Sequence, residues 1–183
     1  MQTLAEQSHS FAEIQDKLVK GALDLFRGYG LSVEHSMGAA SVQIDGPTVM
    51  AVVGFAAPSV RGALLIATTR GVVAALQPAE IRKAAPSEAF LRDILGEFCN
   101  MLMARVKNRL ATRESTPLLS TPTTVFGENI VLPAPTSGMS AWHRFGSNAG
   151  AIYARLDTTF ELEFSLPPDE NVVSAAEGEM VMF

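Results

Sequence analysis

Cysteine is almost absent from this sequence. The 183 residues include one cysteine, Cys99, which excludes an internal disulfide framework and a cysteine-rich zinc site. The three histidines lie far apart and lack the spacing of a metal-binding helix. We therefore expect this chain to bind neither a metal nor another cofactor.

Basic residues and long apolar runs are also scarce. Fourteen Lys and Arg against nineteen Asp and Glu give a net charge of -5, which disfavours nucleic-acid binding. The strongly apolar stretch from Met50 to Val60 contains Gly54 and Pro58 and is too short to cross a bilayer. The N-terminal residues MQTLAEQSHS lack a signal-peptide pattern. These features predict a cytoplasmic protein without a membrane partner.

Several common catalytic motifs are missing as well. The sequence contains no phosphate-binding glycine loop, serine-hydrolase elbow or dinucleotide fingerprint. The hydrophobic fraction of 48% and the charged fraction of 18% are those of a globular protein. The length suits one domain. We expect this domain to span residues 1–166, followed by an acidic, partly disordered tail, 167–183.

Two long helices are predicted. Ser10 and Glu13 form a capping box ahead of apolar residues at helical spacing, and Gly28 provides a stop, so the first helix spans about 11–27. The second, about 87–110, has Ser87 as N-cap and an acidic residue in its first turn. A short helix is expected at 70–76.

Apolar or alternating segments predict antiparallel strands. The runs 48–55 and 62–68 are typical of a hairpin with a five- or six-residue connection. Further strands are expected at 122–126, 129–132, 140–144, 149–156 and 158–165, and Ser32 to Gln43 alternates weakly. Helix, strands, helix, strands is the order of a two-layer α+β sandwich. His143 is expected to be a surface or rim residue of its strand, and the neighbouring Trp142 is more typical of a core than of an interface.

A polar stripe runs along the second long helix. On a helical wheel Asp93, Glu97 and Asn100 fall within about 60° of one another, opposite a broad apolar face that includes Cys99. Small residues border the stripe, so a partner could reach it. Two carboxylates and a carboxamide on a rigid helix form a candidate site. The competing interpretation is the solvated face of an amphipathic helix.

The stripe resembles the active-site pattern of the CheC/CheX/FliY family of chemotaxis phosphatases. Asp93, Glu97 and Asn100 are followed by Pro122 after twenty-one intervening residues. The surrounding segments, LGEFCNML at 95–102 and STPTTVFG at 120–127, resemble the helix and strand that flank this pattern. Because the first helix has no Asn three residues after Glu13, the resemblance is to the single-site CheX type.

The resemblance implies a fold, an activity and a partner. The fold would be an α+β sandwich with two long helices packed on an antiparallel sheet. The activity would be hydrolysis of the phospho-aspartate of a CheY-like receiver domain. Asn100 would orient the attacking water and Glu97 would dock to the receiver's lysine, while Asp93 and Pro122 would shape the site. The Mg²⁺ would belong to the receiver.

The resemblance also implies a homodimer that pairs through sheet edges. In the sequence, the uncapped alternating segment 149–156 is an edge candidate. One departure concerns Met103-Ala104-Arg105, where the family usually carries small residues. If Arg105 displaces the helix face, the chain would be a receiver-binding module with little or no turnover. A structural dimerisation domain is the remaining alternative.

Overall fold

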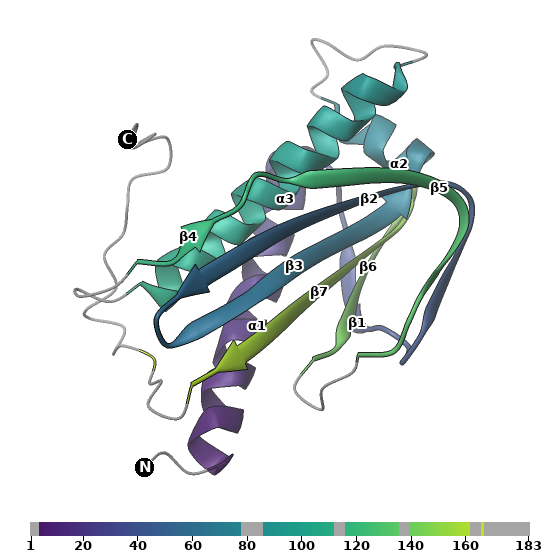
Figure 1. Ribbon diagram of the computed structural model, residues 1–183. Coiled ribbons are helices and arrows are strands. Elements are labelled where there is room, and N and C mark those ends of the chain that lie inside the picture. Colours follow the sequence, from purple (N-terminus) through teal and green to yellow (C-terminus); the bar gives the residue numbers. More distant parts are fainter. Residues whose placement is uncertain (1–3, 78–85, 112–115, 136–139, 162–165, 167–183) are drawn as a thin grey trace.

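Helices and antiparallel strands alternate along the chain (Figure 1). This computed structural model describes residues 4–77, 86–111, 116–135, 140–161 and 166. Its elements are α1 (Leu4–Gly28), β1 (Glu34–Met37), β2 (Val42–Ala57), β3 (Val60–Thr69), α2 (Arg70–Ala75), α3 (Glu88–Leu110), β4 (Leu118–Leu119), β5 (Thr123–Leu132), β6 (Trp142–Ser147) and β7 (Gly150–Phe160). The expected tail, 167–183, lies outside the described residues.

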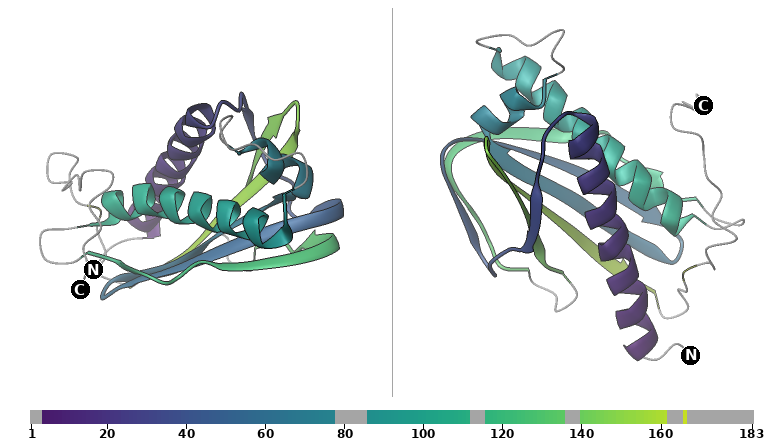
Figure 2. Two further views of the ribbon diagram at one scale, coloured as in Figure 1. Left: turned by 90° about the horizontal axis from the view of Figure 1, so that it is seen from above. Right: turned by 180° about the vertical axis from the view of Figure 1, so that it is seen from behind.

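A single antiparallel sheet supports the helices. Its strand order is β1-β6-β7-β3-β2, and both β4 and β5 pair with the far side of β2. Helices α1 and α3 cover the same face of the sheet, as the two views of Figure 2 show. This arrangement confirms the predicted two-layer α+β sandwich. No described helix combines the length and the hydropathy that a membrane-spanning helix requires.

The main core lies between the helices and the sheet. Phe26 of α1 and Phe98 of α3 stack with ring centroids 4.7 Å apart, and Phe145 of β6 contacts Phe26 from below. A second, smaller cluster lies on the opposite face of the sheet and consists of Val42, Ile44, Ala67, Leu132 and Trp142. The expectation that Trp142 is a core residue is therefore confirmed.

Helix α1 is longer than the sequence indicated. It begins at Leu4, and Ser10 lies inside it with 6% of its surface exposed, so the predicted capping box is wrong. No Gly or Pro interrupts residues 4–10, and the buried face of the helix continues through Ser10. At the other end the left-handed residue is Gly30, with φ of 72°, instead of Gly28. In contrast, Ser87 caps α3 as predicted, because its Oγ accepts a hydrogen bond from the Phe90 N–H.

Several strands also differ from the prediction. The β2–β3 hairpin pairs Ala57 with Val60, so two residues connect the strands instead of five or six. Strand β5 continues through Gly127, because β2 bulges between Ile44 and Pro47, opposite the left-handed Asn129, and the pairing continues on both sides of this irregularity. Strand β7 lies between β3 and β6, so the predicted edge at 149–156 is wrong. The edges are β1 on one side and β4 with β5 on the other.

Candidate functional site

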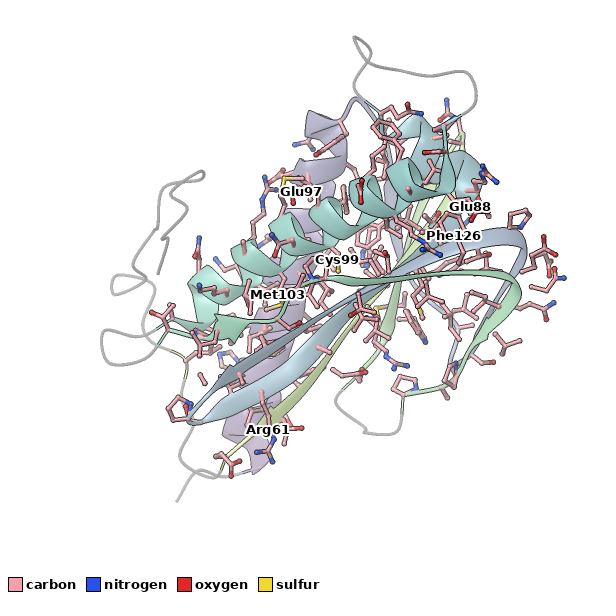
Figure 3. The ribbon with its side chains drawn as sticks, turned by 45° about the horizontal axis from the view of Figure 1, so that its top comes forward. Arg61, Glu88, Glu97, Cys99, Met103 and Phe126 are labelled. Carbon is pink, nitrogen blue, oxygen red and sulfur yellow. The ribbon has the colours of Figure 1, made fainter. Side chains whose placement is uncertain are left out.

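The polar stripe lies on the outer face of α3. Asp93 and Glu97 are exposed and Asn100 is partly exposed. Figure 3 shows Glu97 on the outer side of the helix, whereas Cys99 and Met103 lie between the helix and the sheet. Among the described residues, none forms a hydrogen bond or an ion pair with these three side chains. Two carboxylates and a carboxamide are thus presented to a partner without a competing group from the described part of the chain.

The inner face of α3 anchors the stripe. Leu91, Leu95, Phe98 and Leu102 are completely or almost completely buried. Cys99 is buried beside them, and its thiol lies 3.8 Å from the Leu64 carbonyl oxygen. Burial raises the pKa of the Cys99 thiol to about 12, so almost no thiolate forms at neutral pH. Cys99 is therefore a packed core residue, as predicted, and does not act as a nucleophile.

Pro122 lies against α3 at Gly96. A Cβ on Gly96 would lie 3.6 Å from the Pro122 Cβ and 3.3 Å from the Thr124 Cγ2. The helix approaches the strand this closely because residue 96 has no side chain. The structure thus brings Pro122 together with the helical turn that carries Glu97 and Asn100.

Ser120 fixes the chain just before Pro122. Its backbone N–H donates to the Gly54 carbonyl over 2.9 Å, and its Oγ accepts from the Gly54 N–H at the same distance. The side chain therefore completes the backbone pairing with β2 between β4 and β5. The sequence did not mark Ser120 as a supporting residue, because this pairing joins positions 66 residues apart.

An aromatic residue flanks the stripe on each side. On the side of β5, the Arg92 guanidinium lies over the Phe126 ring, 5.1 Å from its centroid. On the side of α1, the Tyr29 ring meets Phe98 edge to face. Tyr29 was not predicted as a site residue from the sequence, although its place between Gly28 and Gly30 at the end of a helix is a usable signal for a fixed side chain.

Arg105 lies in the contact between the two long helices. Its guanidinium donates a 2.8 Å hydrogen bond to the Gly21 carbonyl of α1. Its Cδ would lie 3.4 Å from a Cβ on residue 21, so Gly21 accommodates the arginine stem. Arg105 thus links α3 to α1 instead of reaching the stripe. The structure gives no support to the hypothesis that this residue displaces the candidate site.

His143 is buried, so its predicted place at a strand rim is wrong. With 4% of its surface exposed, it lies 2.7 Å from Gln15 of α1 and 3.0 Å from His35 of β1. Gln15 Nε2 donates to the Leu156 carbonyl, which leaves its Oε1 to accept from His143 Nε2. His143 Nδ1 must then accept from His35 Nε2. This chain of polar groups joins α1, β6 and β1 beneath the helix layer, away from the stripe.

The described part of the chain has no group of three or more His, Cys, Asp and Glu side chains that could hold a metal ion. The polar groups of the stripe can themselves act on a partner. A carboxamide can both donate and accept, so Asn100 can orient a water molecule. The Glu97 carboxylate can receive a cation from a partner.

Comparisons with known proteins connect this chain with a family. A family model described as chemotaxis phosphatase CheX matches residues 49–145, slightly more than half of the chain. A CheX structure from Vibrio vulnificus is 18% identical, with a TM-score of 0.67 over 80% of this chain and 99% of that chain. A CheC-like superfamily protein from Shewanella sp. PV-4 is 17% identical, with a TM-score of 0.65 over 80% and 97%.

A third similar structure contains a partner. The CheX–CheY–BeF₃–Mg²⁺ complex from Borrelia burgdorferi is 14% identical, with a TM-score of 0.60 over 78% of this chain and 96% of that chain. No curated protein matches the sequence. At these identities the solved structures establish a shared fold.

Proposed function

Because this chain belongs to the CheX family of chemotaxis phosphatases, we propose that it hydrolyses the phospho-aspartate of a CheY-like receiver domain, using Asn100 and Glu97. The observation that carries the proposal is the stripe itself. Glu97 and Asn100 lie side by side on the outer face of α3, without internal partners among the described residues, on a turn that packs against Pro122. The complex of a CheX with CheY in Borrelia burgdorferi supports the choice of partner.

The reaction requires little chemistry from the phosphatase. An acyl phosphate is intrinsically labile, so the enzyme must place a water in line with phosphorus and stabilise the charge that spreads over the phosphoryl oxygens. The Asn100 carboxamide extends from a rigid helix and can hold that water through its oxygen or its NH₂ group. A Mg²⁺ ion on the receiver would neutralise charge on the phosphoryl group, and this chain would not hold it.

Glu97 has the docking role in this proposal. Its exposed carboxylate would pair with the lysine ammonium in the receiver's active site and so set the position of Asn100 relative to phosphorus. A charge pair at an interface of this kind fixes the register of the complex and steers association. Asp93, one turn before Glu97, would border the same site, and Pro122 would hold the helix at a fixed distance from β5.

We also propose that the protein is a homodimer paired through sheet edges. The exposed large hydrophobic residues among the described positions all lie on the edge strands β1, β4 and β5: Met37, Leu118, Val125 and Val131. Unpaired strand edges with apolar side chains favour pairing with another chain. Sedimentation equilibrium should give twice the monomer mass at tens of micromolar, and a monomer at that concentration would contradict this proposal.

Phosphate release from phosphorylated receiver domains of the same organism tests the proposed activity. We expect the wild type to accelerate the decay of one or more receivers, and Asn100→Ala to lose about 10²–10³ in turnover while still binding. Asn108→Ala, two turns further along α3, is the matched control and should retain full activity.

The other outcomes separate the alternatives. If no receiver decays faster but a beryllofluoride-loaded receiver still binds, the chain is a binding module. If an active wild type and Asn100→Ala have equal rates, the stripe is only a solvated face of α3. If no receiver binds or decays faster, the structural alternative is favoured.

A further inference from the structure

Tyr29 holds a fixed position beside the stripe. It directly follows Gly28, the last residue of α1, and its N–H donates to the carbonyls of Leu25 and Phe26. The turn closes with the Leu31 N–H on the Phe26 carbonyl and the Gly30 N–H on the Arg27 carbonyl, each over 2.9 Å. Together with the left-handed φ of Gly30, this is a Schellman motif. Four backbone hydrogen bonds thus fix the turn around Tyr29, and its own N–H makes two of them.

The side chain of Tyr29 crosses from α1 to α3. Its ring lies edge to face with Phe98, with centroids 5.8 Å apart and planes at 63°. Its hydroxyl lies 4.0 Å from the Met101 sulfur. Phe98 follows Glu97 directly, and Met101 lies one helical turn after Glu97. The phenol therefore covers the part of α3 that adjoins Glu97 on the side of α1.

The hydroxyl of Tyr29 is neutral and keeps accepting capacity. Burial, and then the negative charge of Glu97, raise the pKa of Tyr29, so the proton remains on the oxygen at neutral pH. A thioether is a weak hydrogen-bond acceptor, and a contact with it leaves both lone pairs of the phenol oxygen available. A neutral oxygen acceptor therefore lies in the field of an exposed carboxylate.

We propose that the Tyr29 hydroxyl and the Glu97 carboxylate together receive the lysine ammonium of the receiver, Tyr29 as the neutral acceptor and Glu97 as the charged one. The inference rests on the proposed function. An ammonium carries three donors, which one carboxylate rarely satisfies alone. Because the Schellman motif and the Phe98 contact already fix the phenol, little side-chain freedom is lost when the receiver docks. Tyr29 would accordingly be a contact residue that determines affinity for a receiver with a lysine at this place.

Tyr29→Phe separates this role from simple packing, because the ring and its contact with Phe98 remain while the hydroxyl is lost. Tyr153→Phe on β7, at the far face of the sheet, is the matched control. The probe is the receiver loaded with beryllofluoride and Mg²⁺, and the measurements are its Kd by calorimetry, the kcat at saturating phosphorylated receiver, and the thermal midpoint.

We expect Tyr29→Phe to raise the Kd by about five- to tenfold. Its kcat and thermal midpoint should match the wild type, and Tyr153→Phe should change nothing. Against a receiver whose active-site lysine is replaced by methionine, wild type and Tyr29→Phe should bind equally.

Three results would overturn the inference while leaving the proposed function intact. The first is an active wild type together with an unchanged Kd for Tyr29→Phe. The second is a loss of affinity in Tyr29→Phe that is as large for the methionine receiver as for the receiver with its lysine. The third is a fall in the kcat of Tyr29→Phe together with its thermal midpoint. A wild type that neither binds nor dephosphorylates any receiver would overturn the proposed function and this inference together.

Discussion

Gly96 of α3 and Pro122 lie so close that a single methyl group would fill the space between them. The Cβ built on Gly96 lies in ordinary contact with the Pro122 Cβ, at 3.6 Å, and in a tight contact of 3.3 Å with the Thr124 methyl group. Glu97 directly follows Gly96, and Asn100 lies one turn further. The distance between helix and strand at this point therefore sets how far the candidate site projects from the sheet.

Gly96→Ala should show that turnover depends on the position of α3 and not on the stability of the protein. Alanine favours a helix over glycine by about 1 kcal/mol, so the free energy of unfolding should stay level or rise. The new methyl group must push Thr124 or the helix by a few tenths of an ångström. A displaced Asn100 should lower turnover about tenfold.

The control for this variant is Gly28→Ala at the end of α1, where a Cβ would meet nothing within 4 Å. It should stabilise the protein by about 0.5 kcal/mol and leave turnover unchanged. Chemical denaturation and phosphate release, measured on both variants, check the prediction. Full activity in Gly96→Ala would show that the spacing at Pro122 does not position the site.

Glu97→Ala should weaken receiver binding, with a penalty that depends on salt. The carboxylate is exposed, so its attraction to a cationic partner is screened as the ionic strength rises. The ratio of the variant and wild-type Kd values should therefore shrink between about 50 mM and 500 mM salt. The free energy of unfolding should change by less than about 0.5 kcal/mol, as for other exposed polar positions.

Glu128→Ala is the matched control for Glu97→Ala, because it removes an exposed carboxylate from β5. Its Kd should equal that of the wild type at every salt concentration. A salt-independent penalty for Glu97→Ala would show that this residue contributes through the shape of the site instead of its charge.

The sequence predicted those features that depend on local chemistry. Ser87 is recognisable as an N-cap from its immediate neighbours, and the spacing of Asp93, Glu97 and Asn100 places them on one helix face without further information. The α+β fold, the CheX family and the phosphatase class are confirmed. The roles of the individual site residues stay predictions.

The sequence failed where the outcome depends on residues far along the chain. Segment 149–156 looked like an edge because no local signal shows that β3, some 90 residues earlier, pairs with it. His143 looked like a rim residue because its partner Gln15 lies 128 positions away. Ser10 matched a capping pattern, but its place on the buried face of a longer helix decided its structure. In each case a tertiary contact overrode a local pattern.

Arg105→Met should destabilise the protein without affecting its activity. The methionine retains much of the apolar stem but cannot donate to the Gly21 carbonyl, and we expect a loss of about 1–2 kcal/mol in the free energy of unfolding. Turnover should stay at the wild-type level, because this side chain faces α1. Lys107→Met on the same helix is the control and should change stability by less than about 0.5 kcal/mol. Altered turnover in a folded Arg105→Met would revive the hypothesis that Arg105 displaces the helix face that carries the site.

His143 should make the protein less stable in mild acid. Burial, and then the neighbouring His35, lower the pKa of His143 to about 4 in the folded protein, against about 6.5 in an unfolded chain. Between these values the unfolded state binds the additional proton, so the free energy of unfolding falls as the pH decreases from about 6.5 towards 4. Above about pH 6.5 this residue causes no loss of stability. The loss from this residue should approach roughly 3 kcal/mol below pH 4, because each pKa unit corresponds to about 1.4 kcal/mol. Burial also lowers the pKa of His35, which adds to the loss of stability in the same direction.

Urea unfolding of the wild type and of His143→Gln at pH 7 and pH 4.5 measures the effect, with His9→Gln on the exposed face of α1 as control. The variant at position 143 should lose markedly less stability on acidification than the wild type, and equal losses in all three proteins would exclude His143 as the source.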